Sequence, residues 1–278
     1  MKQMRRKVGV VLGSALLFLL FVFCKQNPTL LNTIGTTVCE RFSLPKDYIR
    51  KTPDKKSFGY FLQHTLLKPN EATVHFYNGQ EKPNKVAAAI LNIDVGTKDI
   101  QQCADAVMRL RAEYLFGTQQ FNLLHFNFTN GFNASYLKWR EGYRINVSGN
   151  KVNWVKTNKE SVSYQSFKEY LQIVFTYAGT ASLAKELKLI NMNDLEIGDV
   201  FIKGGSPGHA VIVMDVAINS KTDKKLFMIA QSYMPAQDIH ILVNYNNPTI
   251  SPWYELNPTS EKISTPEWTF YSNQSMRF

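Results

Sequence analysis

The stretch GDVFIKGGSPGHAVIVMDVA (198–217) constrains the fold more than any other part of the chain. Its apolar run 210–216 predicts a buried strand, and the run LFMIAQSY (226–233) predicts a second one. The polar segment NSKTDKK between them is typical of a turn, so the two runs should pair as an antiparallel hairpin. His209 begins the first strand, directly behind the glycine- and proline-rich GGSPG segment. An ionisable ring therefore stands at the mouth of an apolar strand.

Segments that precede this hairpin in the sequence have the apolar spacing of helices. DIQQCADAVMRLRAEYL (99–115) has apolar residues at helical spacing, and Asp99 followed by Gln102 fits a capping box at its start. SFKEYLQIVFTYA (166–178) is amphipathic and ends at a glycine, after which a short helix should run through residue 189. Helices followed by an antiparallel sheet predict an α+β fold, with a buried helix packed on the sheet.

The N-terminus indicates export. The basic residues of MKQMRRK precede the apolar run 8–23, which is typical of a signal segment or an uncleaved membrane anchor. We expect an anchor; a lipidated Cys24 is the alternative, and a buried core helix fits less well. The rest of the chain should then lie on the periplasmic or cell-surface side. We expect residues 1–24 to be this segment, 25–55 a polar tether, and 56–278 a single domain.

Composition and charge narrow the class of protein. The chain of 278 residues is rich in aromatics and modestly charged, which indicates a compact domain. Its net charge is +10, but no basic run is interleaved with aromatics, so a nucleic-acid partner is not expected. No cluster has metal-ligand spacing and no cofactor motif occurs, so we expect neither a metal nor a cofactor. The three cysteines leave a Cys39–Cys103 disulfide open in an oxidising compartment. The oligomeric state is left open.

Two residues have the types needed for nucleophilic catalysis. Cys103 lies near the start of a predicted helix, where the helix dipole favours a thiolate, so we expect its pKa to lie below that of a free thiol. His209 stands on a rigid strand and could serve as its base. The alternatives are a packed core cysteine and an ordinary buried or turn histidine.

Neighbouring polar residues would complete such a site. The hairpin brings the region around Gln231 opposite His209, where the side-chain oxygen of Gln231 could fix the ring's tautomer. His240 is an alternative third member. Gln101 or Gln102 could donate to an oxyanion, together with the backbone N–H of Cys103.

The chain resembles, from about Ser57 onward, the bacterial family known as domain of unknown function 4846. The resemblance lies in LNIDVGTKDIQQCADAVMRLRAEYL, FTYAGTASLAKEL, IGDVFIKGGSPGHAVIVMDVA, AQSYMPAQDIHIL and SPWY. More distantly, GDVFI and GHAVIVMD are similar to papain-like cell-wall peptidases of the NlpC type and to CHAP amidases. That second resemblance implies a papain-like fold with a cysteine that precedes the histidine, as Cys103 precedes His209. Gln102 matches the glutamine that CHAP domains tend to have before the cysteine, whereas Ala104 stands where NlpC-type sequences have serine.

Together these features lead to two expectations. The first is an exported, envelope-associated cysteine hydrolase, an amidase or peptidase whose partner is a cell-envelope polymer or peptide such as peptidoglycan. The second is a non-catalytic envelope binding or structural module on the same fold, in which Cys103 only packs.

Overall fold

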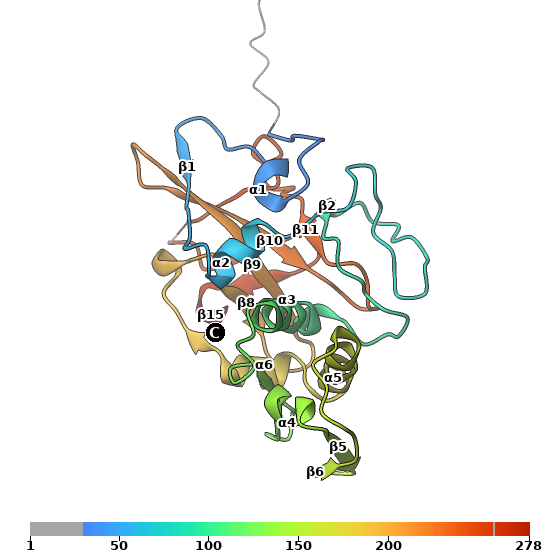
Figure 1. Cartoon of the computed structure of the whole chain (residues 1–278). Helices are drawn as coiled ribbons and strands as arrows, with labels where there is room; N and C mark the ends of the chain where they lie inside the picture. The colour runs from blue at the N-terminus through green and yellow to red at the C-terminus, as the bar shows by residue number, and fades with distance from the viewer. Residues whose placement is uncertain (1–29, 258) are drawn as a thin grey trace, which may run out of the picture.

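The chain folds around one large antiparallel sheet. A computed structural model describes residues 30–257 and 259–278. The sheet has nine strands in the order β2-β11-β10-β9-β8-β15-β7, with β1 added to β9 and β12 to β10 (Figure 1). Its strands are β1 (Tyr48–Arg50), β2 (Ala87–Ile90), β7 (Lys188–Leu189), β8 (Val200–Lys203), β9 (His209–Asn219), β10 (Lys225–Gln231), β11 (His240–Leu242), β12 (Tyr254–Glu255) and β15 (Ser275–Arg277).

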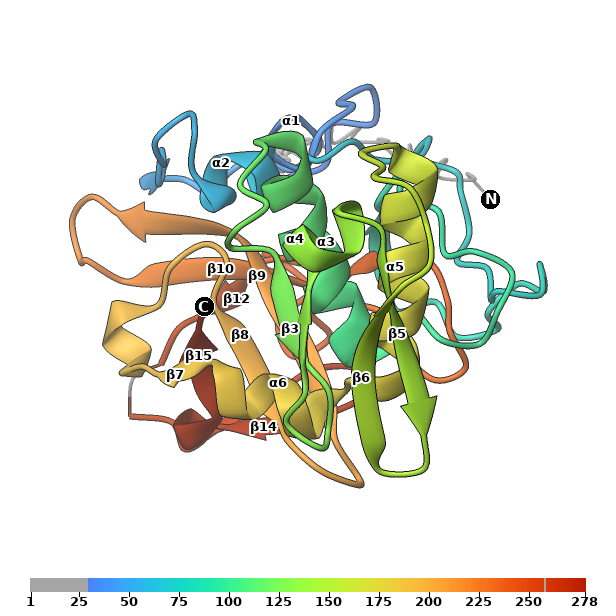
Figure 2. The same cartoon turned by 60° about the horizontal axis from the view of Figure 1, so that its bottom comes forward.

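Three small two-stranded sheets lie outside it. They pair β3 (His125–Asn127) with β4 (Asn133–Ser135), β5 (Tyr143–Ser148) with β6 (Lys151–Lys156), and β13 (Lys262–Ser264) with β14 (Thr269–Tyr271). The helices are α1 (Val38–Arg41), α2 (Phe58–Gln63), α3 (Cys103–Gly117), α4 (Tyr136–Arg140), α5 (Tyr164–Tyr177) and α6 (Thr180–Glu186). Two short 3₁₀ turns are Met192–Asp194 and Ser272–Gln274. Figure 2 shows the β5–β6 hairpin projecting beside α5, away from the main sheet.

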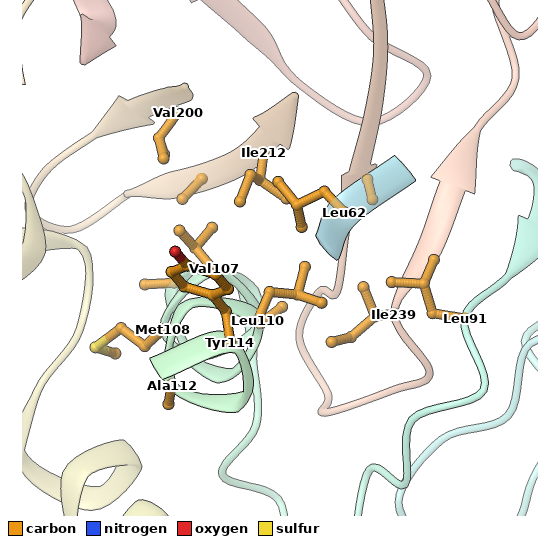
Figure 3. Close-up of a cluster of buried hydrophobic side chains, with 14 of the residues drawn as sticks. Leu62, Leu91, Val107, Met108, Leu110, Ala112, Tyr114, Val200, Ile212 and Ile239 are labelled. Carbon is orange, nitrogen blue, oxygen red and sulfur yellow. The ribbon is translucent and has the colours of Figure 1, made fainter. Parts of the chain in front are cut away.

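Helix α3 is the centre of the larger core. It packs on β9 and β10, and it is buried nearly all round, because the sheet covers one side while α2, α6 and the aromatic residues around α5 cover the others. Val107, Leu110 and Tyr114 point toward Ile212 of β9 and Leu62 of α2 (Figure 3). Burial of such side chains stabilises the fold by about 1.5–3 kcal/mol each.

The other face of the sheet carries a second, smaller core. Successive residues of a strand point to opposite faces, so Ala210 and Ile212 join the cluster of α3 while Val211 and Val213 join the second one. Phe270 of β14 is fully buried in this second cluster. The C-terminal β13–β14 hairpin therefore supplies the cover on the side of the sheet opposite α3.

The α+β fold and the central hairpin are confirmed. β9 pairs antiparallel with β10, with Ala230 opposite Ile212, and one register shift lies between Met228 and Ile229. The predicted amphipathic helix 166–178 is α5, whose apolar face is buried (Phe167, Tyr170, Leu171, Val174 and Phe175). Strand β2 covers only part of the apolar run KVAAAILNIDV (85–95), because only Ala87–Ile90 pair with β11.

The expected tether is wrong for residues 38–55. Val38 and Phe42 are fully buried, β1 pairs with β9, and Arg50 donates to Asp215 at 2.7 Å. The segment is polar and contains prolines, yet Val38 and Phe42 reach the core, while Ile49 stays exposed. The expected signal or anchor over 1–24, including Cys24, lies outside the described residues. Within residues 30–257 and 259–278, no helix has both the length and the apolarity needed to cross a membrane.

Candidate active site

The hairpin brings His209 and Gln231 together as predicted. His209 opens β9 and Gln231 closes β10, and the ring Nε2 lies 2.8 Å from Gln231 Oε1. Gly208 fixes the approach to His209, because a side chain there would overlap the carbonyl oxygen of Gly205 and the hydroxyl of Thr180. Both interacting side chains are almost fully buried, at 1% exposed for each residue. Asp215, farther along β9, is bound by Arg50 and Gln63 and plays no part at this end of the strand.

Behind Gln231 lies a polar network that runs to two loops. Its amide Nε2 donates to Glu267 Oε2 at 2.6 Å and lies 3.5 Å from His240 Nε2. Glu267 in turn accepts from Lys82 Nζ at 2.7 and 2.9 Å, with the Lys82 side chain only 5% exposed. His240 Nδ1 lies 2.8 Å from the carbonyl oxygen of Asp238. We call His209, Gln231, His240, Glu267 and Lys82 the histidine network.

The network determines which nitrogen of His209 carries the proton. An ionised carboxylate only accepts hydrogen bonds, so Glu267 must face the NH₂ group of Gln231. The Gln231 oxygen therefore faces His209 and accepts its Nε2–H. This leaves Nδ1 of His209 as the nitrogen with a free lone pair. A glutamine whose orientation is fixed by a carboxylate–lysine pair thus sets the tautomer of the ring.

His209 is neutral at physiological pH. Burial lowers its pKa to about 4, against the smaller opposing effects of Gln231 and Glu267. The ring packs against Tyr233, Trp268 and Phe270, with centroids 4.8, 5.3 and 5.7 Å away. These aromatic neighbours hold the ring in place and exclude water from its faces.

Cys103 is the first residue of α3, one turn nearer the helix start than the predicted capping box implied. Gln102 is the N-cap, and Asp105 Oδ2 accepts its backbone N–H at 3.0 Å. Asp99 instead accepts from Gln102 Nε2 and from the backbone of Ala236. Because the first N–H groups of a helix have no partner within it, the Cys103 sulfur sits at the positive end of α3.

The expectation of a low Cys103 pKa is wrong for this structure. Burial, and secondarily the carboxylate of Asp105, raise the pKa of the thiol to about 11, although the backbone N–H groups of Ala104 and Ala210 act in the opposite direction. The residue is 8% exposed. Desolvation of the thiolate thus outweighs the stabilisation that the helix start provides. Cys39 and Cys103 are both free thiols, so the disulfide left open by the sequence is not formed.

Cys103 and His209 line one cavity of about 420 Å³ without bonding to each other. No hydrogen bond joins the thiol to the His209 ring within the described part of the chain. Strand alternation explains why: the α3 side of β9 is the face of Ala210, whereas His209 shares the opposite face with Val211. The Cys103 thiol therefore lies on one face of the sheet and the His209 ring on the other. Both reach the same cavity at the end of β9. Phe175, Thr180 and Trp268 complete the cavity wall, together with Gln102, Ala104, Asp105, Ala178, Gly179, residues 205–208, Tyr233 and Met234.

The structure places the two oxyanion candidates in different cavities. Gln102 lines the cavity of Cys103, so it remains a candidate. Gln101 lines a different cavity, and its Oε1 accepts from Arg109 at 2.7 Å, so the structure does not bring it to Cys103. Its Nε2 is buried without a hydrogen-bond partner, as is Asp105 Oδ1. Over the described ranges, no group of three or more His, Cys, Asp and Glu side chains is placed to hold a metal ion.

Sequence reasoning missed Glu267 and Lys82. Lys82 precedes the hairpin by more than a hundred residues and Glu267 lies in the turn between β13 and β14. Neither lies in a pattern that predicts burial. His240, weighed as an alternative to Gln231, belongs to the network but contacts Gln231 and not His209.

Comparison with known proteins identifies one relationship. No curated protein and no solved structure matches the chain. A family described as Domain of unknown function (4846) matches residues 38–277, a range that starts at α1 and contains every residue of the histidine network and Cys103. The match also begins inside the segment that the sequence had suggested as a tether. The chain therefore belongs to the family of this domain of unknown function.

Proposed function

We propose that this protein is a cysteine amidase or peptidase of papain-like architecture, exported and associated with the cell envelope. The observation that carries the proposal is the histidine network: it fixes His209 with Nδ1 free, at a cavity that Cys103 also lines. In this proposal Cys103 is the nucleophile, His209 is the base, and Gln231 is a positioning residue that holds the ring.

The chemistry uses groups already in place. The Cys103 sulfur attacks the carbonyl carbon of an amide while its proton passes to His209 Nδ1. The backbone N–H of Cys103, at the start of α3, and the Gln102 side chain would donate to the resulting oxyanion. Nδ1–H then returns the proton to the leaving amine, and water cleaves the thioester that remains.

The protonation states of Cys103 and His209 before substrate binds determine when the proton is transferred. With the pKa of Cys103 at about 11 and that of His209 at about 4, both groups are neutral at pH 7. In this proposal the resting protein therefore holds no thiolate–imidazolium pair. The proton must leave the thiol as the sulfur attacks, and substrate must bring the two groups into contact around the end of β9.

Peptidoglycan is the proposed substrate class. Its peptide bonds are amides located where an exported protein would meet them, and the looser resemblance to cell-wall peptidases points to the same polymer. The N-terminal basic and apolar segment supports export.

The rival function is a non-catalytic envelope binding module. The burial of Cys103 and the absence of a bond between its thiol and His209 favour this second candidate. Under it, Cys103 is a packing residue and the histidine network stabilises the sheet end.

Digestion of peptidoglycan distinguishes the two. The purified full-length protein should release new free amino groups from peptidoglycan, Cys103→Ala should abolish the release, and Cys39→Ala should retain it because Cys39 lies outside the cavity. Release that persists in Cys103→Ala contradicts the proposed nucleophile. Binding to peptidoglycan without release by the wild type favours the module.

A further inference from the structure

A second cavity, of about 410 Å³, lies away from Cys103 and shares no lining residue with its cavity. It is enclosed by α3, β3 and α6, which lie beside one another in Figure 2. Its walls are mainly apolar, from Leu115, Leu123, Phe126, Leu183 and Phe278, and its polar groups are Arg111, His125, Asn127 and Glu186. This volume is within the range of small-molecule sites.

Arg111 is the unusual member. Its guanidinium carbon lies 5.0, 5.5 and 5.1 Å from the ring centroids of Phe58, Tyr114 and Phe278. Among the described residues no carboxylate pairs with it and no acceptor takes a hydrogen bond from it. The aromatic rings hold the guanidinium plane in position but leave its N–H groups without acceptors. Burial accordingly lowers the pKa of Arg111.

The other polar groups of the cavity already have partners within the protein. Glu186 Oε1 accepts the backbone N–H of Asn127 at 2.7 Å, and its Oε2 lies 3.5 Å from His125 Nδ1. Burial raises the pKa of Glu186, and burial lowers the pKa of His125. Arg111 is thus the cavity's positive group, and the apolar walls are its largest surface.

We infer that this cavity binds a small organic monocarboxylate with an apolar body, whose carboxylate pairs with Arg111. A guanidinium fork matches a planar carboxylate through two parallel hydrogen bonds. A single positive charge balances one negative charge, which favours a monocarboxylate over a doubly charged phosphate. The aliphatic and aromatic wall would cover the apolar body.

Fluorophenylacetate, observed by fluorine NMR, is a suitable probe for the full-length protein, with uncharged fluorophenylacetamide as its control. The acid should bind and the amide should bind at least about tenfold more weakly, because charge-assisted bonds are the stronger ones. Arg111→Gln should weaken acid binding by a similar factor, and Arg111→Lys should restore only part of it. Equal binding of acid and amide, or binding unchanged in Arg111→Gln, overturns the inference.

A second variant tests the cavity without removing the charge. Leu123 is 51% exposed at the cavity, so Leu123→Trp should fill the site and abolish probe binding with little effect on folding. Val155→Trp, on the exposed β5–β6 hairpin, is the matched control and should leave binding unchanged. A wild-type protein that fails to bind the acid, or a Leu123→Trp protein that binds it normally, contradicts the site.

Discussion

The two sides of the candidate active site are built differently. On the histidine side, Gln231 reaches His209, His240 and Glu267, and Lys82 pairs with Glu267, so each residue of the histidine network has a partner. On the cysteine side, Asp105 Oδ1 has no partner and the Cys103 thiol makes no bond to the ring. The base is therefore held rigidly before any substrate arrives, whereas the nucleophile is only placed at the helix start. We therefore expect that substrate binding brings the Cys103 thiol into contact with the His209 ring.

The largest expected effect comes from breaking the histidine side at Glu267. Glu267→Ala leaves the buried Lys82 ammonium without its counter-charge and removes the acceptor of Gln231. Removing one partner of a buried pair costs about 3–5 kcal/mol, so the free energy of unfolding should fall by that order. Denaturation in urea measures it.

Glu255→Ala provides the matched control. Glu255 pairs with Lys224 on the surface, at 2.9 Å and with both side chains largely exposed. That variant should stay close to the wild type. If the two glutamate variants lose similar stability, the network is not the rigid element that the comparison requires.

Acid should lower the free energy of unfolding by protonating His240 as well as His209. Burial lowers the pKa of His240 to about 4 from 6.5. A histidine with a lowered folded pKa contributes stability above its unfolded pKa, and that contribution is lost as pH falls through the window from 6.5 to 4. The shift corresponds to about 3 kcal/mol.

The His240→Gln variant isolates this contribution. Between pH 7 and pH 4 its free energy of unfolding should fall less than that of the wild type, by about that 3 kcal/mol. Urea denaturation at each pH measures the difference. The same pH slope in both proteins would show that His240 does not titrate with the predicted shift.

Part of the candidate active site could be predicted from the sequence, and part could not. Gln231 could be placed beside His209 because a hairpin with a short polar turn fixes which residues lie opposite one another. Cys103 at a helix start followed from helical spacing, although the exact first residue did not. Glu267 and Lys82 could not be found, because loop residues far apart in sequence carry no periodicity. Burial of the Cys103 thiol was also missed, since desolvation depends on how tertiary packing closes the cavity.

A smaller effect should appear at alkaline pH on the cysteine side. The pKa of Cys103 is raised to about 11, from 9.0 for an unperturbed thiol. A group with a raised folded pKa contributes stability below its unfolded pKa and loses it as pH rises through the folded value. The shift corresponds to roughly 2–3 kcal/mol, part of which is lost by pH 10.

Cys103→Ala removes this titration. Between pH 8 and pH 10 its free energy of unfolding should fall less than that of the wild type, by about 1–2 kcal/mol. Denaturation at each pH measures the two slopes. Parallel slopes would mean that the thiol is not desolvated in the folded protein.

Alkylation of the thiols tests the central claim, that His209 is the base for Cys103, most directly. Iodoacetamide is added to the full-length protein at pH 7.5, and mass spectrometry follows Cys103 and Cys39 separately. In the wild type Cys103 should react more slowly than Cys39, because it is buried and its pKa is raised. Iodoacetamide, itself an amide, must enter the cavity that Cys103 and His209 both line, where it stands in for substrate. His209→Gln, which keeps a polar side chain of similar size, should therefore slow Cys103 by a further factor of at least about 10 and leave Cys39 unchanged. A Cys103 rate that is unchanged or faster in His209→Gln would contradict the pairing and favour the non-catalytic module.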